Sequence, residues 1–552
     1  MSLLYFTKNY PLLLSKILSE TNIRKYNISL PVKTKNILLI ILLLGFILRL
    51  IYFKGPTTFF YDQARDAIAS MEIWQNDPLK IMGPQAEIPG LTHGPLYWYL
   101  ISPFYFFTNG NVWVVRLFLI LINCLTIILI YDFTKSLFNN KKVSLLSSFL
   151  FAISFEAIQY ARWLSNPGPS LLTITLSFWA FNKLIEEKKW ALIPFLISLG
   201  LSIQLQLFLL YQIPIFLFLW IAIKGFKLPR TSLKVYFIAI GAFLLTLSTF
   251  VISEIKFKYQ GIKALFILLK PGRTSINIIA RLKSYFHGLT EVTYNNVAGI
   301  NLDYAVIFLT LLLILSYFLY KKNKVKNQFI ILFTWIISPV VVYILPGPKA
   351  YYLNIGMLVP IIILTSYVLV NYFDKYKLII LLVISIIIGG NLFQVFTKNK
   401  EGETLFTVQK QMILRDELKI IDWIYKESEN KPFKLNTITS PLFINTTWAY
   451  LINWHGINKY GYMPYWWGET QVDVPGSKIR FADDAPTNLH YIIIEPRGSD
   501  DKAYIDAIIS LEDTRSKVIK TEKIGYFTVE KREITIPRIF TLHDVFYVVK
   551  NK

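Results

Sequence analysis

Long apolar segments alternate with short polar segments over roughly the first 400 residues of the chain. Several apolar segments approach the roughly 20 residues that a helix needs to cross the hydrocarbon core of a bilayer. The pattern predicts about eleven membrane spans, and the fifth and sixth share one run that no charged loop divides. The predicted spans lie at residues 36–53, 112–131, 143–160, a fourth ending near 181, two within 190–223, and then 233–252, 302–320, 328–345, 351–372 and 378–396.

Two shorter segments lie in the loop between the first two spans, residues 54–111. Helical periodicity over residues 61–75 gathers apolar side chains on one face and leaves Asp62, Arg65 and Asp66 away from that face. Residues 96–107 are apolar and aromatic, but this segment is too short to cross a membrane. We expect both segments to be helices that rest at the membrane–water boundary.

The sequence after the last span has the composition of a soluble domain. Residues 409–427 have helical periodicity, and residues 491–494 and 524–529 have the pattern of strands. The predicted fold is therefore an α-helical polytopic membrane protein with a C-terminal α/β domain. Its predicted parts are an N-terminal arm (1–35), a transmembrane domain (36–397) with long loops at 54–111 and 253–301, and a soluble domain (398–552).

Composition supports the membrane class and orients the chain. The 552 residues are 54% hydrophobic, and the net charge is +23. Much of the Lys and Arg lies in alternate short loops, as the positive-inside rule predicts, so we expect a cytoplasmic N-terminus and an extracytoplasmic C-terminal domain. No basic recognition motif accompanies the charge, which argues against nucleic-acid binding. The single cysteine, Cys124, excludes an intramolecular disulfide and a cysteine-based metal site.

Polar side chains inside the spans share one depth, close to the expected outer face. Such groups are costly in a membrane and usually mark a functional site. We expect a polar cavity at this face; the alternative is that each side chain reaches the lipid headgroups separately. The residues are Arg49, Arg116, Glu156, Gln204, Gln206, Gln212, Glu254 and Lys349.

The first loop concentrates chemically active groups beside this face. Asp62 and Asp66 lie one helical turn apart with Arg65 between them, Glu87 follows in a Pro/Gly-rich turn, and His93 precedes the second short segment. The plain alternative is a solvated polar face with ordinary capping residues. Arg65 would offset the mild repulsion between two carboxylates four residues apart.

Four motifs resemble those of the membrane glycosyltransferases of the GT-C superfold, in particular the family of protein O-mannosyltransferases and aminoarabinose transferases. The motifs are YDQARDA at 61–67, HGPLYWYL at 93–100, ARWLSNP at 161–167 and GPKAYYLNIGMLVP at 347–360. The resemblance covers roughly the first 400 residues. It implies an enzyme that takes a sugar from a polyprenyl-phosphate carrier in the bilayer and transfers it, with inversion, to an acceptor at the extracytoplasmic face.

The resemblance also assigns roles to residues. Asp62 matches the catalytic base of the first loop, and Lys349, Tyr351 and Tyr352 match a motif expected near the carrier phosphate. The family often has Asp where this chain has Asn166. The first loop has no Asp-x-Asp, so we expect no obligatory metal, although a divalent ion is not excluded by the sequence.

The chemistry of glycosyl transfer agrees with these residue types. A carboxylate base removes the acceptor proton, and negative charge stabilises an oxocarbenium-like transition state. We expect Asp66 or Glu87 to orient the acceptor, and cations such as Arg65 and Arg162 to hold the leaving phosphate. The remaining candidates for the walls of the binding site are His93, Tyr97, Asn166 and Gln204.

Two other classes of protein compete with the enzyme. A transporter or flippase of lipid-linked saccharides predicts ionisable groups near the bilayer midplane and inverted repeats, and the sequence shows neither. A non-enzymatic protein of cell-envelope assembly could bind glycan through the aromatic segment 460–467. The sequence indicates neither the sugar nor whether the acceptor is lipid, glycan or protein.

Overall fold

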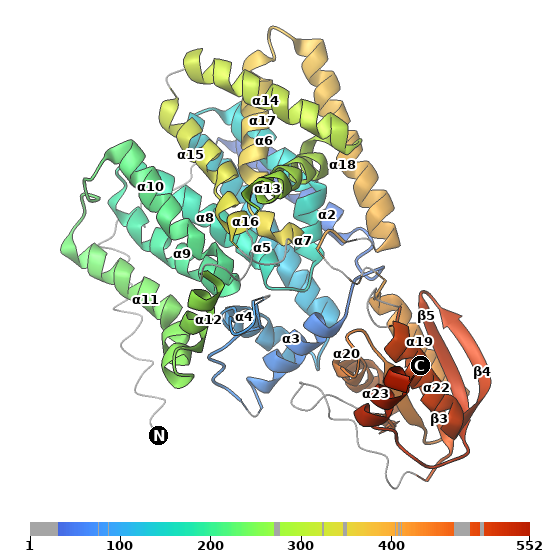
Figure 1. Cartoon of the computed structure of the whole chain (residues 1–552). Coiled ribbons are helices and arrows are strands. Elements are labelled where there is room, and N and C mark those ends of the chain that lie inside the picture. The colour runs from blue at the N-terminus through green and yellow to red at the C-terminus, as the bar shows by residue number, and fades with distance from the viewer. Residues whose placement is uncertain are drawn as a thin grey trace.

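The protein has a large helical part and a smaller α/β part beside it (Figure 1). The structure is a computed structural model. It describes residues 31–75, 77–86, 88–269, 277–322, 325–345, 350–402, 404–406, 409, 411–468, 486–496 and 502–551.

Each predicted span coincides with helical structure. The tenth begins later than expected, because residues Tyr351–Asn354 form a 3-10 turn (η5) before the α-helix starts. The helices are α2 (Val32–Leu50), α5 (Val112–Phe138), α6 (Lys141–Ile153), α7 (Phe155–Arg162), α8 (Pro167–Ile185), α9 (Leu192–Leu205), α10 (Gln212–Lys224), α11 (Leu233–Lys256), α14 (Leu302–Lys322), α15 (Lys326–Ile337), α16 (Val340–Ile344), α17 (Leu358–Tyr372) and α18 (Lys377–Glu401).

The chain is a multi-pass membrane protein. Within the described residues, 6 helices are long and apolar enough to cross a membrane, or 7 if α6 and α7, which meet at 55°, form one broken span. The expected total of eleven is larger because several predicted spans are shorter helices. One of these, α17, is almost entirely buried by its neighbours.

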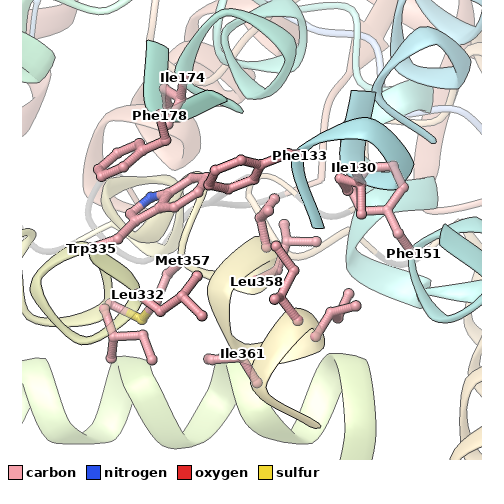
Figure 2. Close-up of a cluster of buried hydrophobic side chains, with 14 of the residues drawn as sticks. Ile130, Phe133, Phe151, Ile174, Phe178, Leu332, Trp335, Met357, Leu358 and Ile361 are labelled. Carbon is pink, nitrogen blue, oxygen red and sulfur yellow. The ribbon is translucent and has the colours of Figure 1, made fainter. Parts of the chain in front are cut away.

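A continuous apolar core joins these helices (Figure 2). Trp335 on α15 stacks on Phe178 of α8, with ring centroids 3.8 Å apart and planes at 3°. The ring of Phe133 of α5 is tilted against Trp335, with ring centroids 6.1 Å apart. Met357 and Leu358 are fully buried beside them. Close packing of this kind fixes the helix positions, so residues attached to the helix ends have defined places.

The loop predicted at residues 253–301 contains helices α12 (Gln260–Leu269) and α13 (Ile278–Thr293), and then a π-helical turn, η4 (Tyr294–Ala298). Tyr285 of α13 donates a hydrogen bond to the carbonyl of Ile336 at 2.9 Å. The second half of this loop is therefore packed against the helical core.

The C-terminal α/β domain is confirmed, with a five-stranded sheet in the order β2-β1-β3-β5-β4. β1 pairs in parallel with β2 and β3, whereas β5 pairs antiparallel with β3 and β4. The elements are α19 (Leu414–Glu427), β1 (Lys434–Ile438), α20 (Thr446–Leu451), η6 (Ile452–Gly456), α21 (Ile457–Tyr460), β2 (Tyr465–Trp466), β3 (Leu489–Ile494), α22 (Lys502–Arg515), β4 (Ser516–Ile524), β5 (Phe527–Ile534) and α23 (Leu542–Asn551).

The strand predicted at residues 524–529 is wrong in its bounds. Ile524 ends β4, Phe527 begins β5, and the two residues between them form the hairpin turn. Gly525 has φ +61°, a left-handed conformation that glycine adopts without strain. The apolar residues on both sides of this turn gave the appearance of one continuous strand.

The two short helices of the first loop lie between the helical part and the C-terminal domain (Figure 1). They are α3 (Tyr61–Glu72) and α4 (Leu96–Phe107), so both predicted helices are confirmed. The amide of Phe59 donates to the carbonyl of Met412 at 3.1 Å, and the amide of Leu414 donates to the carbonyl of Thr57 at 2.8 Å. The first loop and the C-terminal domain therefore lie at the same end of the helical part.

Candidate active site

Helix α3 is fixed at its N-terminus before it presents its polar side chains. Phe59, just before the helix, is fully buried, and Gln63 accepts a hydrogen bond from the amide of Phe60 at 3.1 Å. A side chain that reaches back in this way satisfies one of the free amides at a helix start. The position of Asp62, in the first turn, is thereby defined.

Asp62, Arg65 and Asp66 form one connected group on α3. Arg65 Nη1 lies 2.7 Å from Asp62 Oδ1, and Arg65 Nη2 lies 2.9 Å from Asp66 Oδ1. The Arg65 Nε atom donates to the same Asp66 oxygen at 3.0 Å. A single guanidinium thus holds both carboxylates, as the sequence suggested.

The two carboxylates differ sharply in exposure. The side chain of Asp62 is 43% exposed, whereas that of Asp66 is 2% exposed. The expectation that Asp66 lies on the open polar face is wrong, because α4 covers it and Trp98 Nε1 donates to its Oδ1 at 2.8 Å. Burial raises the pKa of Asp66 above its usual range, although Arg65 acts in the opposite direction.

Asp62 is the carboxylate of this group that a substrate can reach. Its Oδ1 is held by Arg65, and within the described part of the chain its Oδ2 has no hydrogen-bond partner. Burial alone would lower the pKa of Arg65, but Asp66 and Asp62 raise it above its ordinary value, so the guanidinium stays charged. An exposed carboxylate oxygen that an acceptor hydroxyl can reach is able to act as a general base.

The turn at His93 and Gly94 holds the first loop against the membrane helices. The amide of Gly94 donates to the carbonyl of Gln204 at 2.9 Å, and His93 Nδ1 accepts from the amide of Leu207 at 3.0 Å. The Gln204 side chain is itself fixed, because its Nε2 donates to Thr249 Oγ1 at 2.8 Å. Gln204 is therefore a support of the site from the end of α9.

His93 is a neutral imidazole in this setting. Burial lowers its pKa to about 4, and the positive charge of Arg65 acts in the same direction. Because Nδ1 accepts a hydrogen bond from Leu207, the proton of the neutral ring is assigned to Nε2. His93 thus offers a neutral N–H donor close to the Asp62 group. Tyr97, which lies on α4, is buried in the protein core.

Tyr351 of the fourth motif belongs to a separate buried cluster. Its hydroxyl donates to Glu156 Oε2 at 3.0 Å and accepts from Asn295 Nδ2 at 2.9 Å. Asn296 donates to the same Glu156 oxygen at 2.5 Å. Tyr352 packs its ring near Trp163, with centroids 6.0 Å apart. Tyr351 and Tyr352 are adjacent in one motif, but Tyr351 belongs to the polar cluster around Glu156 and Tyr352 to the aromatic cluster around Trp163.

The turn after α7 also supports structure. Arg162 donates to the carbonyls of Ile51 and Tyr52 at 2.7 and 3.1 Å, and so it satisfies the end of α2. Asn166 donates to the carbonyl of Leu205 at 2.7 Å. The amide nitrogen of Asn166 can donate this bond, whereas an ionised aspartate has no donor. This gives a reason why the chain has Asn at a position where the family often has Asp.

The structure thus groups some of the predicted residues and separates others. Asp62, Arg65 and Asp66 are joined by hydrogen bonds, and His93 is near enough to Arg65 for that charge to lower the pKa of its ring. Gln204 holds the turn that carries His93. Arg162, Tyr351 and Tyr352 belong to other clusters. Glu87 and Lys349 lie outside the described residues. Within those residues, no group of three or more His, Cys, Asp or Glu is placed to hold a metal ion.

Sequence reasoning overlooked the role of Trp98. It lies in the aromatic segment expected at the membrane–water boundary, but its indole donates to Asp66 across 32 positions of sequence. Its place in an aromatic run hid this role, because nothing in the sequence distinguishes the one ring that points at a carboxylate. Asn295 and Asn296 lie in the long loop predicted at residues 253–301, where no local pattern marks them as partners of Tyr351 and Glu156.

Comparison with known proteins gives one family and one fold. The family model described as dolichyl-phosphate-mannose-protein mannosyltransferase matches residues 92–252. Among curated protein sequences, none matches the chain. The family match covers the second motif and the turn that holds Asn166, but it ends before the motif of Tyr351 and begins after Asp62.

Two solved structures extend the likeness to nearly the whole chain. ArnT from Cupriavidus metallidurans bound to undecaprenyl phosphate has a TM-score of 0.59 at 10% identity, over 89% of this chain and 97% of that chain. ArnT from the same organism in the apo state has a TM-score of 0.58 at 11% identity, over the same shares. The predicted GT-C fold with a C-terminal α/β domain is confirmed.

Proposed function

We propose that this protein is an inverting glycosyltransferase that moves a sugar from a polyprenyl-phosphate donor to an acceptor at the extracytoplasmic membrane face. The observation that carries the proposal is the half-exposed Asp62, held beside Arg65 at the end of a membrane domain with the ArnT fold. One ArnT structure is bound to undecaprenyl phosphate. The description of the matching family names a dolichyl-phosphate sugar. Both support a lipid-phosphate donor.

In this proposal Asp62 is the base. Its Oδ2 takes the proton of the acceptor hydroxyl while the hydroxyl oxygen forms a bond to the anomeric carbon. The bond from that carbon to the carrier phosphate breaks, and its electron pair leaves on the phosphate. Attack opposite to the leaving group inverts the anomeric centre.

Arg65 and His93 serve the leaving phosphate, and Asp66 positions Arg65. The guanidinium lies 2.7 Å from Asp62, and the charge of Arg65 reaches His93; in this proposal Arg65 and the neutral Nε2–H of His93 stabilise the negative charge as it develops. Asp66 keeps Arg65 in one geometry through two hydrogen bonds. We keep Lys349 as a candidate cation for the same phosphate.

The orientation in the membrane follows from charge and from packing. The first loop and the C-terminal domain share one end of the molecule, through the Phe59–Met412 and Thr57–Leu414 pairs. At the other end, Lys188, Lys224 and Lys227 gather between helices, as positive charge gathers on the cytoplasmic side. Both features support an extracytoplasmic active site.

A transfer assay tests the proposed function. Membranes that contain the protein are incubated with polyprenyl-phosphate sugars labelled in the sugar, and the product is examined for anomeric configuration. We expect the label to leave the lipid and to appear on an acceptor with inverted configuration. Movement of intact donor across the bilayer without cleavage would contradict the proposal and indicate a flippase.

A further inference from the structure

A polar pocket lies beside the junction between the membrane domain and the C-terminal domain. It has a volume of about 30 Å³, and its lining includes Thr57 and Thr58, Arg116, Arg162, Trp163 and Asn399. None of the residues of the Asp62 group lines it. Its walls come from the start of the first loop, from α5, from the turn after α7 and from the end of α18.

Two buried arginines line this pocket, and neither has an ion-pair partner among the described residues. Arg116 is 1% exposed and Arg162 is 6% exposed. Arg116 donates to the carbonyl of Phe53 at 2.5 Å and to the Thr57 hydroxyl, and among the described residues Arg162 donates only to backbone carbonyls. Within the described residues neither guanidinium contacts a carboxylate. Two like charges buried together are costly unless an anion accompanies them.

Further donors in the same lining have no acceptor. Arg116 Nε, Trp163 Nε1 and Asn399 Nδ2 are buried and have no hydrogen-bond partner among the described residues. All three of these groups are hydrogen-bond donors. The missing partner therefore carries several acceptor oxygens and a negative charge, which is the chemistry of a phosphate group.

We propose that this pocket binds a phosphate-type oxyanion, presented by a lipid headgroup or as free phosphate. The site is separate from the reaction centre and does not depend on the proposed function. An anion held here would join Thr58, four residues before Asp62, to Asn399, at the start of the connection to the C-terminal domain. Its binding would stabilise the contact between the two parts of the protein.

A carboxylate of the chain itself could supply the negative charge in place of a ligand. Glu403 lies in sequence between Gly402 and Thr404, two other lining residues, and is outside the described part of the structure. A test has to separate this carboxylate from a ligand. The variant Glu403→Gln removes its charge and keeps its size.

The experiment measures binding to the full-length protein in detergent at constant ionic strength. One arm titrates inorganic phosphate and the other titrates dihexanoyl phosphatidic acid, each by calorimetry and by thermal unfolding. We expect saturable binding that raises the unfolding temperature. Binding of phosphate alone identifies a free-phosphate site, and binding of the lipid alone identifies a headgroup site.

Variants locate the binding. Asn399→Asp places a negative charge in the pocket and is expected to weaken binding by at least about tenfold. Asn458→Asp makes the same charge change on an exposed surface and should leave binding unchanged. If Asn399→Asp does not fold, Thr58→Asp introduces the charge from another wall.

Three outcomes overturn the proposal. The first is absence of binding by both ligands. The second is binding that Asn399→Asp and Thr58→Asp leave unchanged, which would place the ligand elsewhere. The third is binding that appears only in Glu403→Gln, which would show that the chain supplies its own anion.

Discussion

Asp62 and Asp66 show how one turn of helix gives two identical side chains different tasks. Both contact Arg65, but Asp62 is half-exposed and Asp66 is buried under Trp98. A buried carboxylate with three donors on one oxygen is suited to holding a neighbour in place. The exposed carboxylate is suited to exchanging a proton with a substrate.

We predict that Asp66→Asn weakens both the fold and the reaction. Removing the charge leaves Arg65 with Asp62 alone, and a lost hydrogen bond to a charged group costs about 1.5–3 kcal/mol. Trp98→Phe removes one donor of the three and should have a smaller effect. Thermal unfolding and kcat, measured separately from KM, check this. Equal losses in both variants, confined to stability, would contradict a positioning role.

We predict that His93 makes stability depend on pH. Its pKa of about 4 in the folded protein lies below its ordinary value, so the unfolded chain binds more protons between about pH 6.5 and 4. Stability from this group is complete above that window and falls as the pH drops through it. His93→Asn keeps an acceptor for Leu207 but does not titrate, so its unfolding temperature should vary less across the window. If the unfolding temperatures of the wild type and of His93→Asn change with pH in parallel, the lowered pKa assigned to His93 is refuted.

At the scale of elements, the sequence predicted the helices well and their contacts poorly. The bounds of α4 and the start of α3 agree with the predicted segments, because aromatic composition and helical periodicity are local properties. The burial of Asp66 depends on Trp98, and the split between Tyr351 and Tyr352 depends on how η5 meets two other elements. These facts are tertiary, so no local pattern contains them.

The turn before α4 depends on a glycine at position 94, which leads to a testable prediction. A Cβ added at Gly94 would overlap with Gln204 Oε1 and lie 2.9 Å from the Gln204 carbonyl oxygen, so Gly94→Ala must displace the turn that carries His93. We expect lower transfer and a loss of about 1–3 kcal/mol of stability. Gly241→Ala is the control, since a Cβ there meets nothing within 4 Å. Equal behaviour of the two variants in both assays would argue against a close contact at Gly94.

At the scale of the whole molecule, the C-terminal domain is packed against the first loop. Tyr450 of α20 is buried, stacks on Phe59 with ring centroids 5.5 Å apart, and donates to the carbonyl of Gly110 at 2.5 Å. A shared apolar core continues from α4 and α5 into α19 and α20. The domain is therefore a support of the loop that carries Asp62.

We predict that Tyr450→Ala loosens this contact. Removing a buried ring costs about 3–5 kcal/mol, whereas Tyr450→Phe removes one hydrogen bond and should cost about 1 kcal/mol. Limited proteolysis between the last membrane helix and α19, together with the unfolding temperature, tests whether Tyr450→Ala is the more destabilised of the two variants. The packing would be refuted if the alanine variant resisted protease as well as the wild type.

The central claim is that the exposed carboxylate of Asp62 is the base of a sugar transfer from a lipid phosphate. The most direct measurement compares Asp62→Asn with Asp77→Asn, a matched change at an exposed carboxylate of the same loop that pairs with Lys80 at 2.7 Å. With equal amounts of folded protein, we predict that Asp62→Asn lowers the transfer rate by about 10²–10⁴-fold and that Asp77→Asn leaves it unchanged. Full transfer by Asp62→Asn would contradict the claim.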